Sequence, residues 1–253
     1  MIDALDLSAP AALGVLAAFF AGGLMKGGLG FGLPLVTISI TPFFVPVDLA
    51  IALNAAVLPF VNMLQVWQAG TLGETLRRYW PLILMLSLTM PIGVLLGLAV
   101  SAEGLTLALG LAITAFTLFQ WVNPRLVLPQ RLERPIGAGV GVVAGICGGL
   151  TSINGPFFVL YLVGLGVERR VMMSALGVFF LLTGVLLSGS FAAVGLLDGP
   201  RLLAALACLL PAFAGMAAGN RLARRVPQEA FRRIVLSGLL LLGLNITLRG
   251  LTG

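Results

Sequence analysis

The chain has 253 residues, of which 59% are hydrophobic and only 9% are charged. Its mean hydropathy of +1.11 excludes an ordinary soluble globular domain and indicates an integral membrane protein. The net charge of +6 would suggest a nucleic-acid partner in a soluble protein, but here the arginines lie in short loops between apolar runs, so we expect anionic lipid headgroups and no nucleic acid.

The first residues carry Asp3 and Asp6 and no basic group, so they lack the positive start of a signal peptide and we expect them to be retained. Apolar segments then follow in chain order, five in each half of the chain. In the first half they cover residues 10–25, 29–47, 49–68, 79–100 and 104–122. In the second half they cover residues 136–150, 153–167, 171–197, 202–220 and 231–248.

The two halves are related by a constant offset of 122 residues, which indicates an internal duplication. Glycine pairs suited to close helix packing recur at this offset, and so do single residues: Gly23/Gly27 with Gly145/Gly149, Gly93/Gly97 with Gly215/Gly219, Pro34 with Pro156, Gly73 with Gly195 and Asn123 with Asn245. We divide the chain into repeats 1–125 and 126–253. Because five segments is an odd number, the second repeat must be inverted in the membrane, and such folds are commonly transporters.

Arginine placement predicts the orientation of the chain, because cytoplasmic loops collect basic residues. The loops after segments three, five, seven and nine hold twelve of the fourteen arginines: Arg77, Arg78, Arg125, Arg131, Arg134, Arg169, Arg170, Arg221, Arg224, Arg225, Arg232 and Arg233. The opposite side receives most of the acidic residues, with Arg201 and Arg249 as exceptions. We therefore predict that both termini face away from the cytoplasm.

The first two segments of each half are short and joined by glycine-rich links, residues 22–34 and 145–156. Such interrupted pairs are the best sequence indication of a transporter site. Each pair either crosses the membrane twice or forms a re-entrant hairpin, giving 8 to 10 membrane segments in an all-α protein. Residues 151–155 contain no charge that would hold them at a water interface, which favours re-entrant or broken helices.

On that model two helix N-termini face a shared cavity near the midplane, and their free N–H groups bind an anion. Pro34 and Pro156 suit the first turn of these helices, and glycines let backbone amides approach a ligand. The candidate substrate-binding residues in the links are Gly27, Gly28, Gly30, Gly32, Thr151, Ser152, Asn154 and Gly155. The alternative is that glycines only allow close packing, which we prefer for Gly93, Gly97, Gly215 and Gly219.

Lys26 is the only lysine of the chain and lies within the first link. A charge at membrane depth is costly and usually functional, so on the re-entrant model Lys26 attracts an anion. If the first two segments instead cross fully, Lys26 is an ordinary cytoplasmic loop residue.

Other polar residues lie within the apolar segments. Asn54 and Ser174 are candidates to line the substrate path, although an interhelical hydrogen bond is the simpler interpretation of each, as it is of Asn62 and Gln65. Asp48 is the candidate for coupling to a proton or sodium ion, with an interfacial charge as the simpler alternative.

Several chemistries have no residues to support them. The chain contains no histidine, which excludes a Ser/His/Asp or Cys/His catalytic set, and it has no nucleotide-binding loop. Cys147 and Cys208 lie in apolar or glycine-rich runs without metal-ligand spacing. We expect no enzyme activity, no cofactor and no metal.

The glycine-rich first link and the second link, which reads Gly-Gly-Leu-Thr-Ser-Ile-Asn-Gly-Pro, resemble the TauE/SafE sulfite exporter family, also called TSUP. The resemblance covers essentially the whole chain. It implies transport of sulfur-containing anions such as sulfite, sulfoacetate and other organosulfonates across the bacterial inner membrane. It does not identify the substrate, the direction or the oligomeric state.

We therefore expect a secondary transporter that moves a small anion by alternating access. A passive anion channel on the same scaffold is the first alternative, and it would show poorly saturable flux without a coupling ion. A membrane assembly factor that transports nothing is the second, and it would bind a protein partner and no anion.

Overall fold

The computed structural model describes residues 7–122, 127–222 and 228–252, and over these ranges it is all-helical. The described ranges contain ten α-helices, which overlap the predicted apolar segments, and the prediction of a helical membrane protein is confirmed. The helices are α2 (Ala9–Leu29), α3 (Leu33–Ile40), α4 (Val47–Ala69), α5 (Leu72–Ala99), α6 (Ala102–Val122), α7 (Glu133–Thr151), α8 (Gly155–Gly164), α9 (Arg169–Ala193), α10 (Gly199–Leu222) and α11 (Gln228–Thr252). Asp3, Asp6, Asn123, Arg125, Arg224 and Arg225, and the boundary predicted between the repeats, lie outside the described residues.

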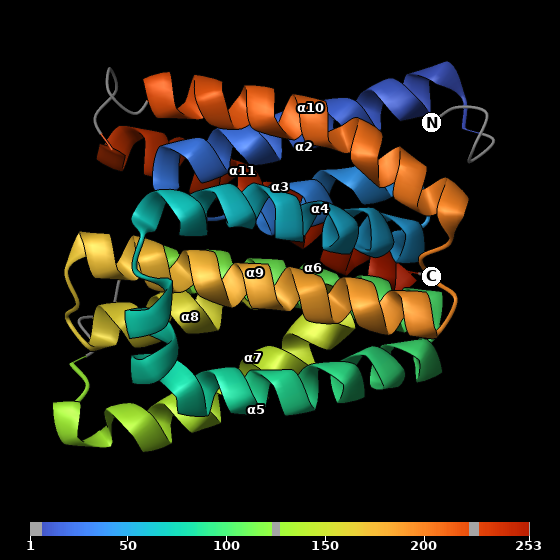
Figure 1. The fold of residues 1–253 in the computed structure, drawn as a ribbon. Helices are drawn as coiled ribbons and strands as arrows, with labels where there is room; N and C mark the ends of the chain where they lie inside the picture. The colour runs from blue at the N-terminus through green and yellow to red at the C-terminus, as the bar shows by residue number, and fades with distance from the viewer. Residues whose placement is uncertain (1–6, 123–126, 223–227, 253) are drawn as a thin grey trace.

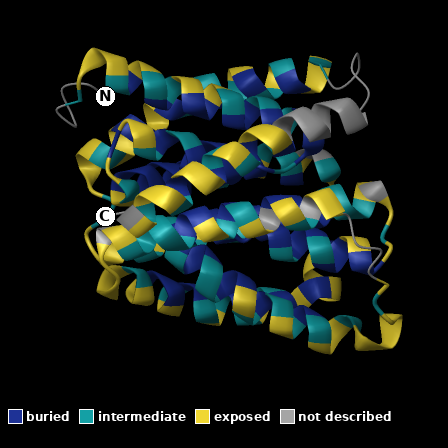
Figure 2. Cartoon of the chain, turned by 180° about the vertical axis from the view of Figure 1, so that it is seen from behind, coloured by how far each residue is buried: buried dark blue, intermediate teal, exposed yellow. Residues whose placement is uncertain are grey.

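The helices are stacked in layers that run roughly parallel to one another (Figure 1). Helix α2 packs along α10 at one face, and α5 packs along α7 at the opposite face. Helices α4 and α9 pack against each other at the centre, and α6 packs along α11. The residues between these layers are buried, while the outward faces of the helices are exposed (Figure 2).

Helix ends in the two halves recur at the offset seen in the sequence. Helices α2 and α7 end at Leu29 and Thr151, which are 122 residues apart. The same separation relates the first residues of α4 and α9, Val47 and Arg169. The contacts follow the same correspondence, because α2 packs on α10 as its counterpart α7 packs on α5. Each half therefore contributes the partner of the other half's first helix.

Glycines allow the close approach of α2 and α10. A Cβ added at any of four positions would lie against a backbone carbonyl of the facing helix: Gly23, Gly27, Gly215 and Gly219. The equivalent contact between α5 and α7 uses Gly93, Gly145 and Gly149, while Gly97 is packed less closely. Small residues at this spacing bring helix backbones together in membranes.

Helices α3 and α8 are much shorter than the segments predicted for them. With 8 and 10 residues they extend about 12 and 15 Å at 1.5 Å per residue, too little to cross a core of about 30 Å. Six other described helices, α2, α4, α5, α7, α9 and α10, are long and apolar enough to cross. The loops before the short helices, residues 30–32 and 152–154, lie inside the protein, where irregular backbone is tolerated at membrane depth.

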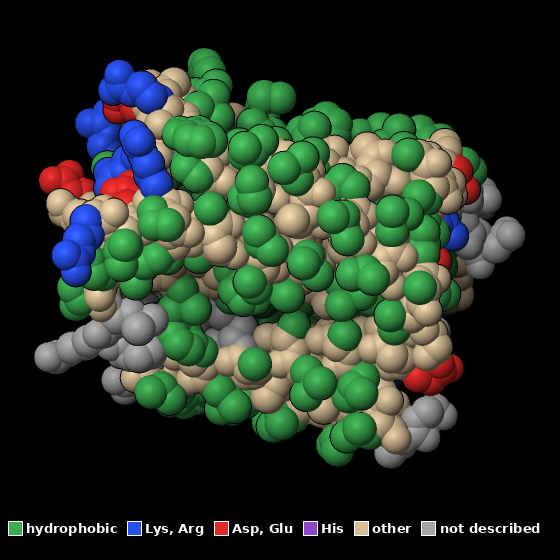
Figure 3. Space-filling model, turned by 90° about the horizontal axis from the view of Figure 1, so that it is seen from below, with side chains coloured by type: hydrophobic (Ala, Val, Ile, Leu, Met, Phe, Trp, Pro, Cys, Tyr) green, Lys and Arg blue, Asp and Glu red, His purple; other side chains and the backbone are tan. Residues whose placement is uncertain are grey.

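The surface fits a lipid environment. Large hydrophobic side chains such as Trp67 and Leu210 are each 78% exposed, and apolar residues cover most of the face seen in Figure 3. Lysine and arginine side chains gather mainly at one end of that face. The turn between α4 and α5, which precedes Arg77 and Arg78, lies at one end of the molecule (Figure 1). The first residues of α2 and the last residues of α11 lie at the opposite end.

The packing of α7 on α5 predicts that Gly145→Ala lowers the stability of the protein. Alanine favours a helix by about 1 kcal/mol over glycine, but here its Cβ would press on Thr89 and Leu86, and overpacking typically costs about 1–3 kcal/mol. Gly139→Ala in the same helix is the matched control, because no atom lies within 4 Å of its Cβ position. Thermal unfolding in detergent should show a lower Tm only for Gly145→Ala, and equal Tm values for both variants would contradict this packing.

Candidate functional site

Lys26 lies in the last turn of α2 with only 3% of its surface exposed. Its Nζ donates hydrogen bonds to Oδ1 of Asn62 at 2.6 Å and to Oε1 of Gln65 at 2.8 Å. Asn62 and Gln65 are three residues apart on α4, so both face α2 from one side of the helix. We call these three residues the Lys26 cluster.

Other hydrogen bonds orient the two amides of the Lys26 cluster. Nδ2 of Asn62 donates to the carbonyl of Leu58 at 2.8 Å, and Nε2 of Gln65 donates to the carbonyl of Met173 on α9 at 2.8 Å. Because both amide NH₂ groups are engaged, both amide oxygens point toward the ammonium. Gln65 also connects the central helices α4 and α9.

The positive charge of Lys26 has no acidic partner in the described part of the chain. The two ion pairs found there are Arg78 with Glu133 and Arg201 with Asp48. Burying a charge without an opposite charge costs several kcal/mol, and such residues in membrane proteins usually mark an ion or substrate pathway. The arrangement suits an anion, which would supply the missing charge.

A second polar group, the Ser152 cluster, consists of Thr37, Asn54 and Ser152. Nδ2 of Asn54 donates to Oγ of Ser152 at 3.2 Å, and Oγ1 of Thr37 donates to Oδ1 of Asn54 at 2.8 Å. All three side chains are fully buried. The cluster joins the end of α7 to α3 and α4.

Ser152 ends α7 in the left-handed backbone region, with φ of 60°, and its N–H donates to the carbonyl of Gly148. Its counterpart in the first half is Gly30, which ends α2 with φ of 84°. Glycine adopts this conformation freely, whereas a residue with a Cβ is strained there, by about 1 kcal/mol or more. The second half thus carries a hydroxyl at a position where glycine would be easier to accommodate.

Asn154 precedes α8 and is 1% exposed. Its Nδ2 donates to Oγ1 of Thr183 at 2.8 Å, while its Oδ1 is buried without a hydrogen-bond partner. Helix α8 then begins at Gly155 with no side-chain cap, and α3 begins after Gly32 in the same way. The start of a helix can bind an anion through its first N–H groups, but at α8 Pro156 has no N–H and the N–H of Phe157 already donates to the carbonyl of Asn154.

The sequence predicts that the polar residues of the two links converge on one point near the midplane. In the structure they form two separate clusters. The Lys26 and Ser152 clusters contact α4 at Asn62 and Asn54, which are about 12 Å apart along the helix at 1.5 Å per residue. The first helix also runs further than predicted, because α2 continues to Leu29 and includes Lys26, which leaves a link of only residues 30–32. The site is therefore two clusters along α4.

The remaining candidates in the links have local partners. A Cβ at Gly27 would lie against the carbonyl of Met216, and Gly28 is buried in the same helix. Gly30 and Gly32 have positive φ angles. Oγ1 of Thr151 donates to the carbonyl of Cys147 and accepts a hydrogen bond from the N–H of Ile153.

Pro34 and Pro156 each occupy the first turn of a short helix, α3 and α8. A missing N–H costs nothing there, because the first N–H groups of a helix have no partner within it.

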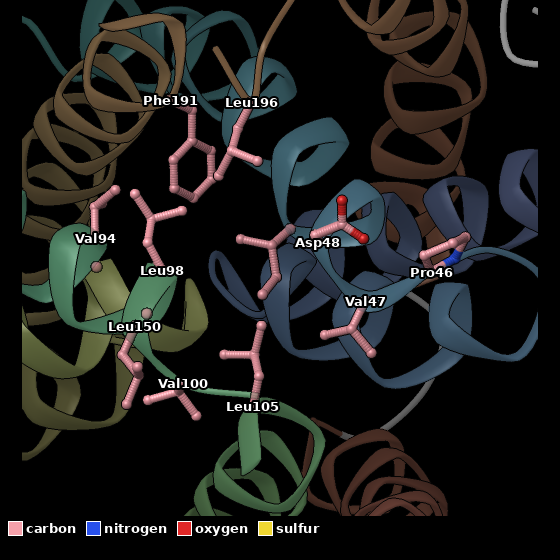
Figure 4. Close-up of a pocket in the computed structure, with 13 residues that line it drawn as sticks. Pro46, Val47, Asp48, Val94, Leu98, Val100, Leu105, Leu150, Phe191 and Leu196 are labelled. Atoms are coloured by element: carbon pink, nitrogen blue, oxygen red, sulfur yellow. The ribbon is translucent and has the colours of Figure 1, made fainter. Parts of the chain in front are cut away.

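Asp48, the candidate for coupling, lies at the edge of a largely apolar cavity of about 470 Å³ (Figure 4). Its carboxylate is 3.7 Å from Arg201 and half-exposed. This environment supports an interfacial charge. The cavity lies between helices α4, α5, α6, α7 and α9, and its wall includes Ile51, one turn before Asn54.

The sequence predicts interhelical hydrogen bonds for Asn62 and Gln65. It does not indicate a role for Thr37, Thr183 or Phe180. The spacing of Asn62 and Gln65, which puts two amides on one face of an apolar helix, was the available signal. Phe180 carries no polar signal, yet its ring centroid lies 5.7 Å from Nζ of Lys26. Among the described residues there is no cluster of histidine, cysteine or acidic side chains that would hold a metal.

The fold and these clusters define a multi-pass helical membrane protein with a buried cation beside its two central helices. The model of the sulfite exporter TauE/SafE family matches residues 15–246, nearly the whole chain, and the chain belongs to this family. No curated protein and no solved structure matches it. The family prediction is thus confirmed, and the family is described as one of sulfite exporters.

The strained backbone of Ser152 predicts an unusual order of stability between two variants. Ser152→Gly and Ser152→Ala both remove the bond from Asn54, but only Ser152→Gly relieves the strain. We expect Ser152→Gly to be more stable by about 1 kcal/mol, the reverse of the order within a helix. Thermal unfolding of the two variants measures this difference directly. An alanine variant at least as stable as the glycine variant would show that Ser152 is not strained.

Proposed function

We propose that this protein is a secondary transporter that moves a small sulfur-containing anion, such as sulfite, sulfoacetate or another organosulfonate, by alternating access. Family membership supports the class of substrate. The single observation that carries the assignment of the site is the ammonium of Lys26, which is buried without an acidic partner among the described residues. We propose that the protein lies in the inner membrane of a bacterium.

In the proposed mechanism, the anion first pairs with Lys26 and is held by charge and hydrogen bonds. An oxyanion accepts hydrogen bonds and donates none, so it competes with the oxygens of Asn62 and Gln65 for the ammonium. The hydroxyl of Ser152, which lies beside Asn54 of α4, then offers a donor further along that helix. The substrate thus exchanges one set of donors for the next.

We further propose that the two repeats, 1–125 and 126–253, are inverted and that each first hairpin re-enters from its own membrane face. The packing supports this, because α2 and α10 form one side of the molecule and α5 and α7 the other. Movement of one side against the other about the α4–α9 contact would alternate access.

The site assignment predicts that sulfur oxyanions stabilise the protein and that Lys26→Met abolishes the effect. A ligand that binds only the folded state at 100 times its Kd adds about 2.7 kcal/mol of stability. Methionine keeps the length of the side chain and removes the buried charge, so the variant should fold. Thermal unfolding in detergent with sulfite, sulfate, thiosulfate, sulfoacetate, taurine and acetate gives the measurement.

Arg221→Met is the matched control, because Arg221 is an exposed cation in the last turn of α10. Its variant should respond to anions as the wild type does. Stabilisation that survives in Lys26→Met would disprove the assignment of Lys26. The absence of any stabilisation in the wild type would favour a weakly binding channel or an assembly factor.

The gathering of arginines at one end predicts the sidedness of the protein. We expect that end to face the cytoplasm, since cytoplasmic loops collect basic residues. A C-terminal alkaline phosphatase fusion should then be active in bacterial cells, and a C-terminal fluorescent-protein fusion should not fluoresce. The same fusions placed at Gly70, in the turn between α4 and α5, should behave in the opposite way. A fluorescent C-terminal fusion would show that the C-terminus faces the cytoplasm and that the predicted orientation is wrong.

A further inference from the structure

One aromatic ring lies against both parts of the site. Phe180 of α9 is 2% exposed, and its ring centroid is 5.7 Å from Nζ of Lys26. On the side of α8, a Cβ added at Gly155 would lie 3.0 Å from Cζ of Phe180. Gly155 follows Asn154 at the start of α8. The ring thus lies against both the Lys26 cluster and the start of α8.

Two contacts hold the ring of Phe180 in place. The ring of Phe158 packs against it edge-on, with centroids 5.7 Å apart and an interplanar angle of 74°. The ammonium of Lys26 lies within the roughly 6 Å at which a cation is attracted to an aromatic face. The first contact is apolar and independent of charge. The second depends on the charge of Lys26 and weakens when an anion neutralises it.

We propose that Phe180 is the barrier between the Lys26 cluster and the start of α8 and that Lys26 keeps it closed until an anion binds. This inference rests on the proposed function. An apolar constriction excludes ions because they must lose water to pass it. An anion that pairs with Lys26 removes the hold of the ammonium on the ring, so the ring moves and the anion passes to the start of α8.

The duplication shows that the packing of the repeat does not require this ring. The counterpart of Phe180 at the offset of 122 residues is Leu58, which is buried in α4 beside Gly184. An aliphatic side chain fills the equivalent place in the first half. The aromatic residue, Phe180, is in the second half, and its ring lies near Lys26, the only lysine of the chain.

The test compares sulfite and chloride fluxes through protein reconstituted in liposomes. Phe180→Ala should raise the chloride flux about tenfold, the change that a barrier lower by about 1.4 kcal/mol produces, and should reduce the preference for sulfite. Thermal stabilisation by sulfite should persist, because Lys26 is unchanged. Phe179→Ala is the matched control, since it removes the same side chain from the next position of α9, where the ring contacts Phe158 and Tyr79.

Equal preference for sulfite in Phe180→Ala and the wild type would overturn the proposal. An equal loss of preference in Phe180→Ala and Phe179→Ala would also overturn it, because the cause would then be general loosening of the core. If Phe180→Ala does not fold, Phe180→Leu, which keeps most of the volume, should still leak more chloride than the wild type. A wild type that neither binds nor transports sulfite would refute the proposed function, whereas the chloride leak would still test the barrier.

Discussion

The hydrocarbon core of a membrane contains no water, so every polar backbone group and every charge placed there needs a partner inside the protein. This constraint explains the burial of the loops 30–32 and 152–154, where the chain leaves its helices. It also explains why Lys26 is surrounded by oriented amide oxygens. Neutral oxygens solvate an ammonium but leave its charge uncompensated, and in the proposed function the anionic substrate recognises that residual charge.

The glycine contacts determine how the two halves are joined. Helix α2 is held by α10 and α7 by α5, so the first hairpin of each half is anchored to a long helix of the other half. Lys26 lies on α2 and its acceptors lie on α4, while Gln65 connects α4 to α9. A shift between the α2–α10 and α5–α7 sides would therefore act directly on the polar residues between them.

The two halves share glycines that pack the helices but not the polar residues of the Lys26 and Ser152 clusters. At the offset of 122 residues Lys26 corresponds to Gly148, and Asn54 corresponds to Leu176. The glycine contacts are therefore similar in the two halves, and the residues of the candidate site lie where the halves differ. This difference gives the site a direction along α4, from a charged cluster with an aromatic ring beside it to a neutral cluster of hydroxyl and amide groups.

The sequence by itself determined the membrane class and the approximate positions of the helices, and it indicated a duplication, because hydropathy and glycine spacing are properties of short stretches of chain. It also singled out Lys26 and Ser152 as polar residues in apolar surroundings. The tertiary structure alone decided that Lys26 meets Asn62 and Gln65 and that Ser152 meets Asn54. These pairs are separated by 36, 39 and 98 residues, and their contacts depend on the depth and rotation of whole helices, which local patterns do not encode.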